Sequence, residues 1–433
     1  RSRTDGGGFD AYASSYFTEQ SRGTSCYASS TIDDKTTTTL QLIEILWWLC
    51  LLLVIYTYVG YGIILRLLVD LKRSRENQRE VIDYQEFCPE TTIVIAAYNE
   101  ADFIEEKIQN TLQLDYPSDK LQVVIVTDGS TDATPAIVRQ YSEVKLLHQP
   151  ERRGKIAAVH RTMKEVNTPI VIFTDANTYL NPKAISNIVR HYRNPQIGGV
   201  AGEKRIHVAE KDSASGAGEG FYWKYESALK TWDAELYSVV GAAGELFSIR
   251  TELYEDILQD TVIEDFYLTL RIAQKGYRIA YEPDAYALEG PSASVKEELK
   301  RKIRIAAGGI QAIVRLKALL NIFRYGMLSF QYISHRVLRW TVTPFALVLV
   351  FILNIFLFGR SEFYQLTFYG QILFYLAALV GYALANRSVK IKAFFIPYYF
   401  FIMNYAVFRG IIRYVQGRQS VTWERAQRSE YKG

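Results

Sequence analysis

Apolar residues of this chain are concentrated in four long runs, one near its start and three near its end. They cover residues 43–68, 338–358, 363–384 and 393–412. A helix of about 20 apolar residues crosses a hydrocarbon core of about 30 Å, so the pattern predicts membrane helices at both ends of the chain. Within the last run, Pro397, Asn404 and Arg409 indicate a span that is broken, tilted or re-entrant.

The stretch between these runs has the pattern of an α/β domain. Residues 91–100 ("TTIVIAAYNE"), 120–130 ("KLQVVIVTDGS") and 169–177 ("PIVIFTDAN") each contain a continuous apolar run rich in β-branched residues. Such runs are typical of strands buried on both faces, and helix-like segments separate them, which predicts a parallel sheet. Polar residues follow each strand, at the edge where open α/β sheets bind ligands.

Changes in composition divide the chain into six parts. These are a polar arm (1–38), a transmembrane helix (39–70), the α/β domain (71–300), amphipathic interface helices (301–337), transmembrane segments (338–415) and a basic tail (416–433). Lys72, Arg73 and Arg75 follow the first span, which predicts a cytoplasmic α/β domain. The basic tail favours the same side, and a hairpin in the last apolar run would allow it.

Charge and cysteine content exclude several classes of function. The net charge is only +4, which argues against a dedicated nucleic-acid binder. The three cysteines have no metal-ligand spacing, and an odd number suits no disulfide framework. The five histidines are scattered, so surface or packing roles are expected for them.

Seven motifs carry side chains suited to chemistry on a sugar nucleotide. They are "AAYNE" (96–100), "VTDGSTD" (126–132), "RRGKIAAVH" (152–160), "TDAN" (174–177), "VVGAAGELF" (239–247), "VIEDFYLTL" (262–270) and "RKIRIAAGG" (301–309). Carboxylates hold hydroxyls and hard divalent ions, and guanidinium forks suit a diphosphate. Each motif also fits a structural role, such as a turn, a cap or the acidic first turn of a helix.

These motifs resemble those of the inverting family-2 membrane glycosyltransferases, especially the processive polysaccharide synthases for hyaluronan, chitin, cellulose and poly-N-acetylglucosamine. The resemblance covers roughly residues 40–430. It implies a GT-A-type, Rossmann-like cytoplasmic domain inserted between transmembrane helices, with interface helices beside it. It also implies a UDP-sugar donor and a divalent metal cofactor, magnesium or manganese.

The resemblance assigns donor-binding roles at the strand ends and on the basic segment. The residues expected to bind the nucleotide sugar are Ala97, Tyr98, Glu100, Asp128, Lys155, Asp175, Arg301 and Arg304. The metal ligands implied are Asp175 and Asn177, where the neutral amide replaces the second acid of an Asp-x-Asp motif. That replacement leaves less negative charge for the ion.

The resemblance also assigns the catalytic and acceptor-binding residues. Asp265 is the expected general base, because a sugar hydroxyl needs a carboxylate to take its proton, and Glu264 is the expected positioning neighbour. The acceptor is expected to contact Gly241, Gly244, Glu245 and Ile305. Ile305 stands where the synthases have a tryptophan beneath the acceptor sugar, so the acceptor is where this chain departs from the pattern.

Three functions are compared on these grounds. The leading hypothesis is an integral, multi-pass enzyme of the cell membrane that moves sugar from a UDP-sugar onto a growing glycan, with export of the polysaccharide as an open question. The alternative is transfer of one sugar to a polyisoprenyl phosphate or another lipid, which an apolar Ile305 favours. A non-enzymatic transport or receptor subunit fits poorly with the acids at 175, 264 and 265. The expected partners are the sugar donor, the acceptor and the lipid bilayer. An accessory subunit or a second copy of the chain is a further possible partner.

Overall fold

The computed structural model describes residues 37–75, 87–206, 213–290, 294–385 and 391–417. Most of the predicted polar arm and basic tail lies outside these residues. The chain divides into two compact units, one made of residues 1–54 and 346–373, the other of residues 55–345 and 374–433. The second unit contains the whole α/β domain.

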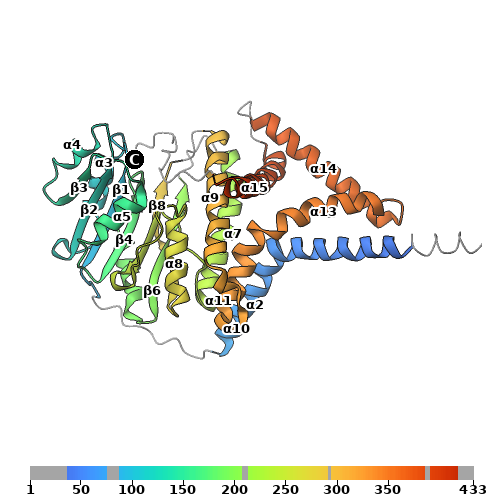
Figure 1. Ribbon diagram of the computed structural model, residues 1–433, viewed down its shortest axis with the longest axis horizontal. Coiled ribbons are helices and arrows are strands. Elements are labelled where there is room, and N and C mark those ends of the chain that lie inside the picture. Colours follow the sequence, from blue (N-terminus) through green and yellow to red (C-terminus); the bar gives the residue numbers. More distant parts are fainter. Residues whose placement is uncertain (1–36, 76–86, 207–212, 291–293, 386–390, 418–433) are drawn as a thin grey trace, which may run out of the picture. The chain divides into compact units, whose positions relative to one another are not determined.

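The α/β domain is built on one eight-stranded mixed sheet (Figure 1). Its strands are β1 (Thr91–Ala97), β2 (Leu121–Asp128), β3 (Val144–Gln149), β4 (Ile170–Asp175), β5 (Thr178–Leu180), β6 (Ile197–Ile206), β7 (Leu246–Arg250) and β8 (Arg278–Glu289). Their order is β3-β2-β1-β4-β7-β6-β8-β5. The first four strands of that order pair in parallel, whereas β7 is antiparallel to both of its neighbours.

The three predicted strands are confirmed as β1, β2 and β4, and they pair in parallel as expected, although the sheet as a whole is mixed. β8 is parallel to β6, and β5 is antiparallel to β8, so the second half of the sheet is mixed. The sequence hides this half, because β6 ("IGGVAGEKRI") is rich in glycine and charge and lacks the apolar run of a buried strand.

Two hydrophobic cores cover the two faces of the sheet. Along β1, Ile93 and Ile95 belong to one core, and Val94 and Ala96 belong to the other, as the two-residue period of a strand requires. Helices α3 (Ile104–Leu112), α4 (Thr134–Val138) and α6 (Ala184–Val189) pack in the first core, and α5 (Lys155–Met163) and α8 (Glu264–Gln274) pack in the second. Burial on both faces explains the continuous apolar run of β1.

Several helices outside the sheet also belong to the second unit. They are α2 (Tyr61–Arg75), α7 (Ser213–Leu236) and α9 (Val295–Arg315), followed by shorter turns of helix: η6 (Lys317–Leu320), α10 (Ile322–Tyr325), α11 (Met327–Tyr332), η7 (Ile333–Val337) and α12 (Leu338–Trp340). The hydroxyl of Ser294 caps α9 by accepting from the Glu297 amide at 3.2 Å. The domain boundary predicted at residue 301 therefore falls inside a helix that begins at Val295.

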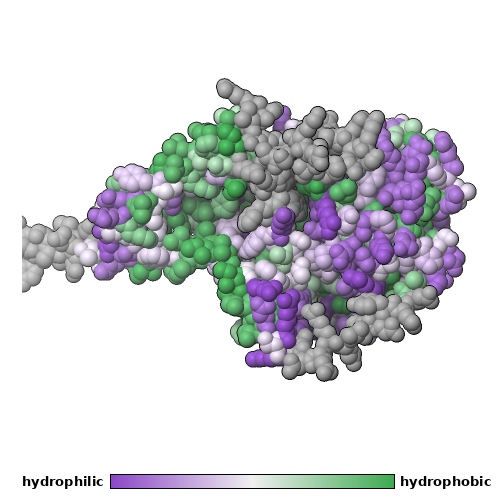
Figure 2. All heavy atoms as spheres, turned by 180° about the vertical axis from the view of Figure 1, so that it is seen from behind, coloured by the Kyte–Doolittle hydropathy of each residue, from purple (hydrophilic) through white to green (hydrophobic). Residues whose placement is uncertain are grey.

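Three described helices are long and apolar enough to cross a membrane: Thr37–Arg75, Glu362–Ala385 and Ala393–Val415. A bent pair, Met327–Trp340 with Val342–Leu357, makes a fourth if it counts as one span. Figure 2 shows apolar side chains over helical parts of the surface and hydrophilic ones over the α/β domain. The structure thus contains suitable helices in the regions at both ends of the chain where membrane helices were predicted.

The predicted hairpin in the last apolar run is wrong, because α15 (Lys392–Val415) is one helix. The break lies instead in the run predicted at 338–358, where the bent pair turns by 54° next to Thr341. Pro344 explains it, since a proline ring clashes with the carbonyl four residues earlier and its nitrogen donates no hydrogen bond. Pro397 lies inside α15, at its sixth residue, and the helix continues past it.

The first unit joins residues 37–54 to most of α13 (Val342–Leu357) and to the first half of α14 (Glu362–Ala385). The indole of Trp47 donates to the Val350 carbonyl at 3.1 Å. Asn354 donates to the hydroxyl of Thr367 at 3.1 Å and to the side chain of Gln371 at 3.2 Å, so its amide is paired inside an otherwise apolar cluster.

Candidate active site

One cavity of about 880 Å³ in the second unit gathers most of the predicted site residues. It is lined by Glu100, Lys155, Asp175, Asn177, Gly241, Gly244, Glu245, Glu264, Asp265, Arg301, Arg304 and Ile305. Ala97, Tyr98 and Asp128 line a smaller hollow that also reaches Lys155. The structure therefore brings all the predicted residues to one place, although what each of them does there stays a prediction.

The small hollow contains an acid with an unused oxygen. Asp128 ends β2, and its Oδ2 accepts from the backbone amides of Arg153 at 2.8 Å and Gly154 at 2.6 Å. Its Oδ1 is buried and has no hydrogen-bond partner among the described residues. Because burying an unpaired oxygen is costly, this atom is suited to accept from a ligand. Beside it, the Arg152 guanidinium lies 3.7 Å from the centre of the Tyr98 ring.

A lysine joins two acids at the centre of the cavity. Lys155 is the first residue of α5, and its Nζ lies 2.9 Å from Asp175 Oδ1 and 2.8 Å from Glu264 Oε1. Burial alone lowers the pKa of Lys155, but the two carboxylates outweigh burial and raise it. Lys155 also holds the pKa of Glu264 below its ordinary value against the effect of burial. Lys155 and Glu264 are therefore both charged at neutral pH.

Asp265, the next acid along the chain, has a raised pKa, whereas that of Glu264 is lowered. Burial, and then the charge of Glu264, raise the pKa of Asp265 to about 7. Its carboxylate faces Gly244, where an added Cβ would lie 3.6 Å from Asp265 Oδ2. The glycine therefore leaves room for a ligand atom next to a carboxylate whose pKa suits proton transfer near neutral pH.

Glu245 belongs to a buried charge network rather than to an open surface. Lys204, on β6, contacts both Glu245 and Glu289, and Arg301 on α9 donates to Glu245 at 2.7 Å. Burial raises the pKa of Glu245, but Lys204 and Arg301 lower it far more. The predicted pair of Arg301 and Arg304 does line the cavity, with Arg301 already bound to an acid. The sequence did not indicate Lys204, because a single lysine in a glycine-rich strand forms no recognisable motif.

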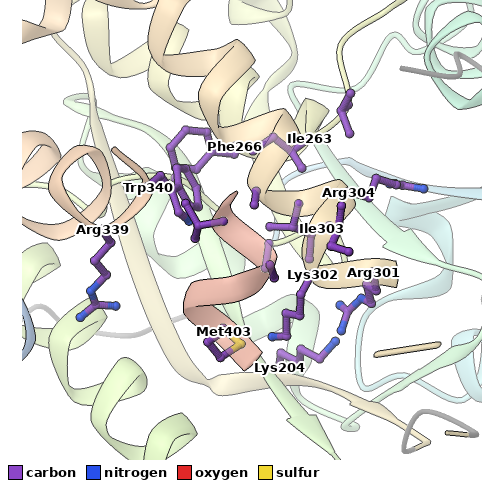
Figure 3. A pocket seen from close by; sticks show the side chains of 18 of the residues that line it. Lys204, Ile263, Phe266, Arg301, Lys302, Ile303, Arg304, Arg339, Trp340 and Met403 are labelled. Atoms are coloured by element: carbon purple, nitrogen blue, oxygen red, sulfur yellow. The ribbon is translucent and has the colours of Figure 1, made fainter. Parts of the chain in front are cut away.

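An aromatic pair that the sequence did not indicate lines the cavity next to Asp265. Phe266 packs against Gly241, whose φ of +92° and lack of a Cβ make room for the ring. Trp340, from α12, lies with its ring centre 5.3 Å from that of Phe266 (Figure 3). The indole also packs on α9, where a Cβ at Gly309 would lie 2.4 Å from it. Trp340 belongs to a segment predicted to cross the membrane, so only the packing of the folded chain shows that it lines the cavity.

The residues present fit a divalent ion only together with a ligand. Asp175 and Asn177 offer hard oxygen atoms to the cavity, as magnesium and manganese require. The described residues contain no group of three or more His, Cys, Asp or Glu placed to hold a metal. Since magnesium is commonly bound by one or two carboxylates plus substrate phosphates, this donor set is sufficient when a diphosphate completes it.

Residues 92–258 match the family described as glycosyl transferase family 2. This part of the chain is therefore similar to a family-2 glycosyltransferase domain. The poly-beta-1,6-N-acetyl-D-glucosamine synthase of Staphylococcus aureus (strain MSSA476) is 26% identical over 235 residues, which are 52% of this chain and 55% of that protein. The synthase of the same name from Staphylococcus epidermidis is 24% identical over the same shares. The match thus spans about half the length of these relatives.

A solved structure has a similar fold. It is the mannosyltransferase PcManGT from Pyrobaculum calidifontis in complex with GDP-Man and Mn²⁺, with a TM-score of 0.62 and 24% identity. The similarity covers 86% of this chain and 99% of that one. The chain therefore resembles the family-2 glycosyltransferases, including polysaccharide synthases, as its motifs predicted, and its α/β domain has the expected glycosyltransferase fold.

Proposed function

We propose that this protein transfers a sugar from a nucleotide sugar to an acceptor hydroxyl, with Asp265 as the general base. The observation that carries the proposal is a carboxyl group with a pKa of about 7 in a cavity that also contains Lys155, Asp175 and Arg304. A general base works best when its pKa is near the working pH, and cations beside it suit a diphosphate leaving group.

The reaction is a single displacement. Asp265 takes the proton of the acceptor hydroxyl while that oxygen forms a bond to the anomeric carbon. The bond from this carbon to the diphosphate breaks, and the nucleoside diphosphate leaves with the electron pair. Attack opposite to the leaving group inverts the anomeric centre. Glu264, held by Lys155, keeps the negative charge that raises the pKa of its neighbour.

Donor binding is assigned to the strand ends. We assign nucleoside binding to Tyr98 and to Asp128, whose Oδ1 is unpaired, and neutralisation of the diphosphate to Lys155 and Arg304. Magnesium or manganese held by Asp175 and Asn177 would supply further positive charge on the leaving group. We propose UDP as the nucleotide, as the resemblance of the motifs to the polysaccharide synthases implies, and a guanosine nucleotide is the alternative that the complex of PcManGT with GDP-Man suggests.

The acceptor is assigned to the side of the cavity formed by Ile305, Trp340 and the loop of Gly241 and Gly244. A growing glycan is the leading acceptor, because the relatives are polysaccharide synthases and an indole face suits a sugar ring. Processive transfer with export across the cell membrane, in which the apolar helices lie, belongs to the same proposal.

A lipid acceptor is the second candidate, and a specific observation favours it. Apolar side chains of α15, among them Ile396, Met403 and Val407, line the same cavity as the catalytic acids. An apolar wall of this kind suits a hydrocarbon chain.

A nucleotide-sugar screen tests the proposed function. Purified full-length chain in lipid nanodiscs is given a set of UDP- and GDP-sugars, and release of nucleoside diphosphate and product size are measured. Release from one donor with a ladder of long products supports the glycan acceptor, whereas one sugar on an extractable lipid supports the second candidate. The absence of sugar transfer from every donor, with wild-type folding, would refute the proposal.

A further inference from the structure

Lys155 places its positive charge between the carboxylates of Asp175 and Glu264. Its Nζ lies 2.9 Å from Asp175 and 2.8 Å from Glu264, and the three side chains are each about one-fifth exposed or less. An ammonium is a compact point charge with three donors, so this position satisfies both carboxylates. The acids that face the centre of the cavity are thus already partly neutralised before any ligand binds.

The same ammonium competes with a metal ion for Asp175. An ion bound to Asp175 Oδ1 at the usual distance of ~2.1 Å would lie within ~5 Å of Lys155 Nζ. Two positive charges this close repel each other strongly in a buried site. Asn177, the other expected oxygen ligand, is neutral and adds no charge to offset the repulsion.

A donor diphosphate removes the conflict. It brings oxygen ligands for the ion and negative charge for the ammonium, so both cations become balanced. Lys155 also has a flexible side chain and begins α5, whose first amides favour an anion. The ammonium therefore has a new partner within the cavity when it gives up Asp175.

We infer that Lys155 acts as a built-in counter-ion that keeps a divalent metal out of the empty site, so that metal and nucleotide load together. The inference rests on the proposed function, since it assumes that the ligand is a nucleotide diphosphate. It assigns to Lys155 a positioning role toward the metal in addition to its proposed role toward the diphosphate. Free metal binds weakly to the wild-type protein, and the nucleotide makes binding tight.

Binding of Mn²⁺ tests the inference without any sugar transfer. Free Mn²⁺ is titrated by electron paramagnetic resonance against wild-type protein, Lys155→Met and Lys155→Arg, with and without UDP. Without nucleotide, Lys155→Met is expected to bind Mn²⁺ about tenfold or more tightly than wild type, because a nearby positive charge is gone. Lys155→Arg keeps the charge and is expected to stay weak. UDP is expected to tighten binding to wild type far more than to Lys155→Met.

Two further variants locate the effect. Lys164→Met removes an exposed lysine just after the end of the same helix and is expected to leave Mn²⁺ binding unchanged. Adding Asp175→Asn to Lys155→Met is expected to abolish the gain, which shows that the ion sits on Asp175. Melting curves of each variant exclude unfolding as the cause.

The inference is overturned if wild type and Lys155→Met bind free Mn²⁺ equally, or if Lys164→Met has the same effect. These outcomes are separable from failure of the proposed function. Sugar transfer without the Mn²⁺ difference refutes only the role of Lys155. The Mn²⁺ difference without transfer from any nucleotide sugar leaves the competition for Asp175 in place and refutes the enzyme.

Discussion

The cavity has two walls of different origin. The sheet wall is formed by Glu100, Lys155, Asp175 and Asn177, which lie at or shortly after the end of a strand or begin the helix α5. The helix wall is formed by residues of α9, α12 and α15, among them Arg304, Ile305, Trp340 and Met403.

The two walls differ in how their residues are held. Glu100, Asp175 and Asn177 lie at or within three residues of the ends of β1 and β4, which are buried on both faces, and Lys155 begins α5, which packs on the sheet. The helix wall is held by side-chain packing between segments far apart in the chain, such as Gly309 against Trp340 and Gly410 against Ala306. We therefore expect the sheet wall, together with Arg304, to determine the donor and the chemistry, and the apolar residues of the helix wall to determine the acceptor.

The largest expected effect comes from the acid between the walls. Asp265→Asn removes the proposed base, and we expect the transfer rate to fall by about 10²–10⁴-fold. Binding of UDP, measured by calorimetry, should change little, because the proposed donor contacts are made by other residues. Loss of UDP binding together with activity would instead mean that Asp265 helps to hold the donor.

A second effect concerns the link between the walls. Lys204→Met leaves Glu245 and Glu289 buried without their shared partner, and we expect the free energy of unfolding to fall by about 3–5 kcal/mol. Denaturant unfolding in detergent measures it. Lys145→Met is the control, because its pair with Glu165 is exposed and should contribute less than about 1 kcal/mol. Equal losses in both variants would show that Lys204 does not stabilise the junction.

The pH dependence of transfer tests the protonation of the base. The pKa of Asp265 is raised to about 7, and only its ionised form accepts a proton. The rate should therefore rise with pH through about 7 and fall about tenfold per pH unit well below it. UDP binding measured over the same range serves as the control. A rate that stays flat down to about pH 5 would argue that Asp265 has an ordinary carboxyl pKa.

The smallest expected effect is confined to the helix wall. At Gly309, an alanine Cβ would lie 2.4 Å from the Trp340 ring, so Gly309→Ala must displace the indole. We expect the KM for the acceptor to rise about three- to tenfold with the donor KM unchanged, a cost of about 1 kcal/mol. Gly370→Ala, which has open space around its Cβ, is the matched control. A change in donor KM would show that the two walls do not act separately.

The motifs at strand ends were predictable because their chemistry is local. A buried strand has a continuous apolar run, and the polar residue that follows it must lie at the edge of the sheet, which is how Asp128 and Asp175 were found. β3, β6 and β8 escaped prediction, because edge exposure, glycine and alternating polarity weaken that signal.

The break in the bent helix and the continuity of α15 show another limit. Both runs contain a proline, at 344 and 397, and composition alone suggested a break in the wrong one. The chain bends beside Pro344 but forms one continuous helix through Pro397, so the tertiary context and not the presence of a proline decided where the break lies.

The sequence by itself determined the kind of fold, the apolar helices and the acids at 175, 264 and 265, because these follow from local periodicity and from short motifs. Only the tertiary structure decided that Lys155 stands between Asp175 and Glu264, that Glu245 is bound by Lys204 and Arg301, and that Trp340 lines the cavity. These contacts join residues tens to more than a hundred positions apart. Charge balance and packing at such separations depend on the folded arrangement, which no local pattern encodes.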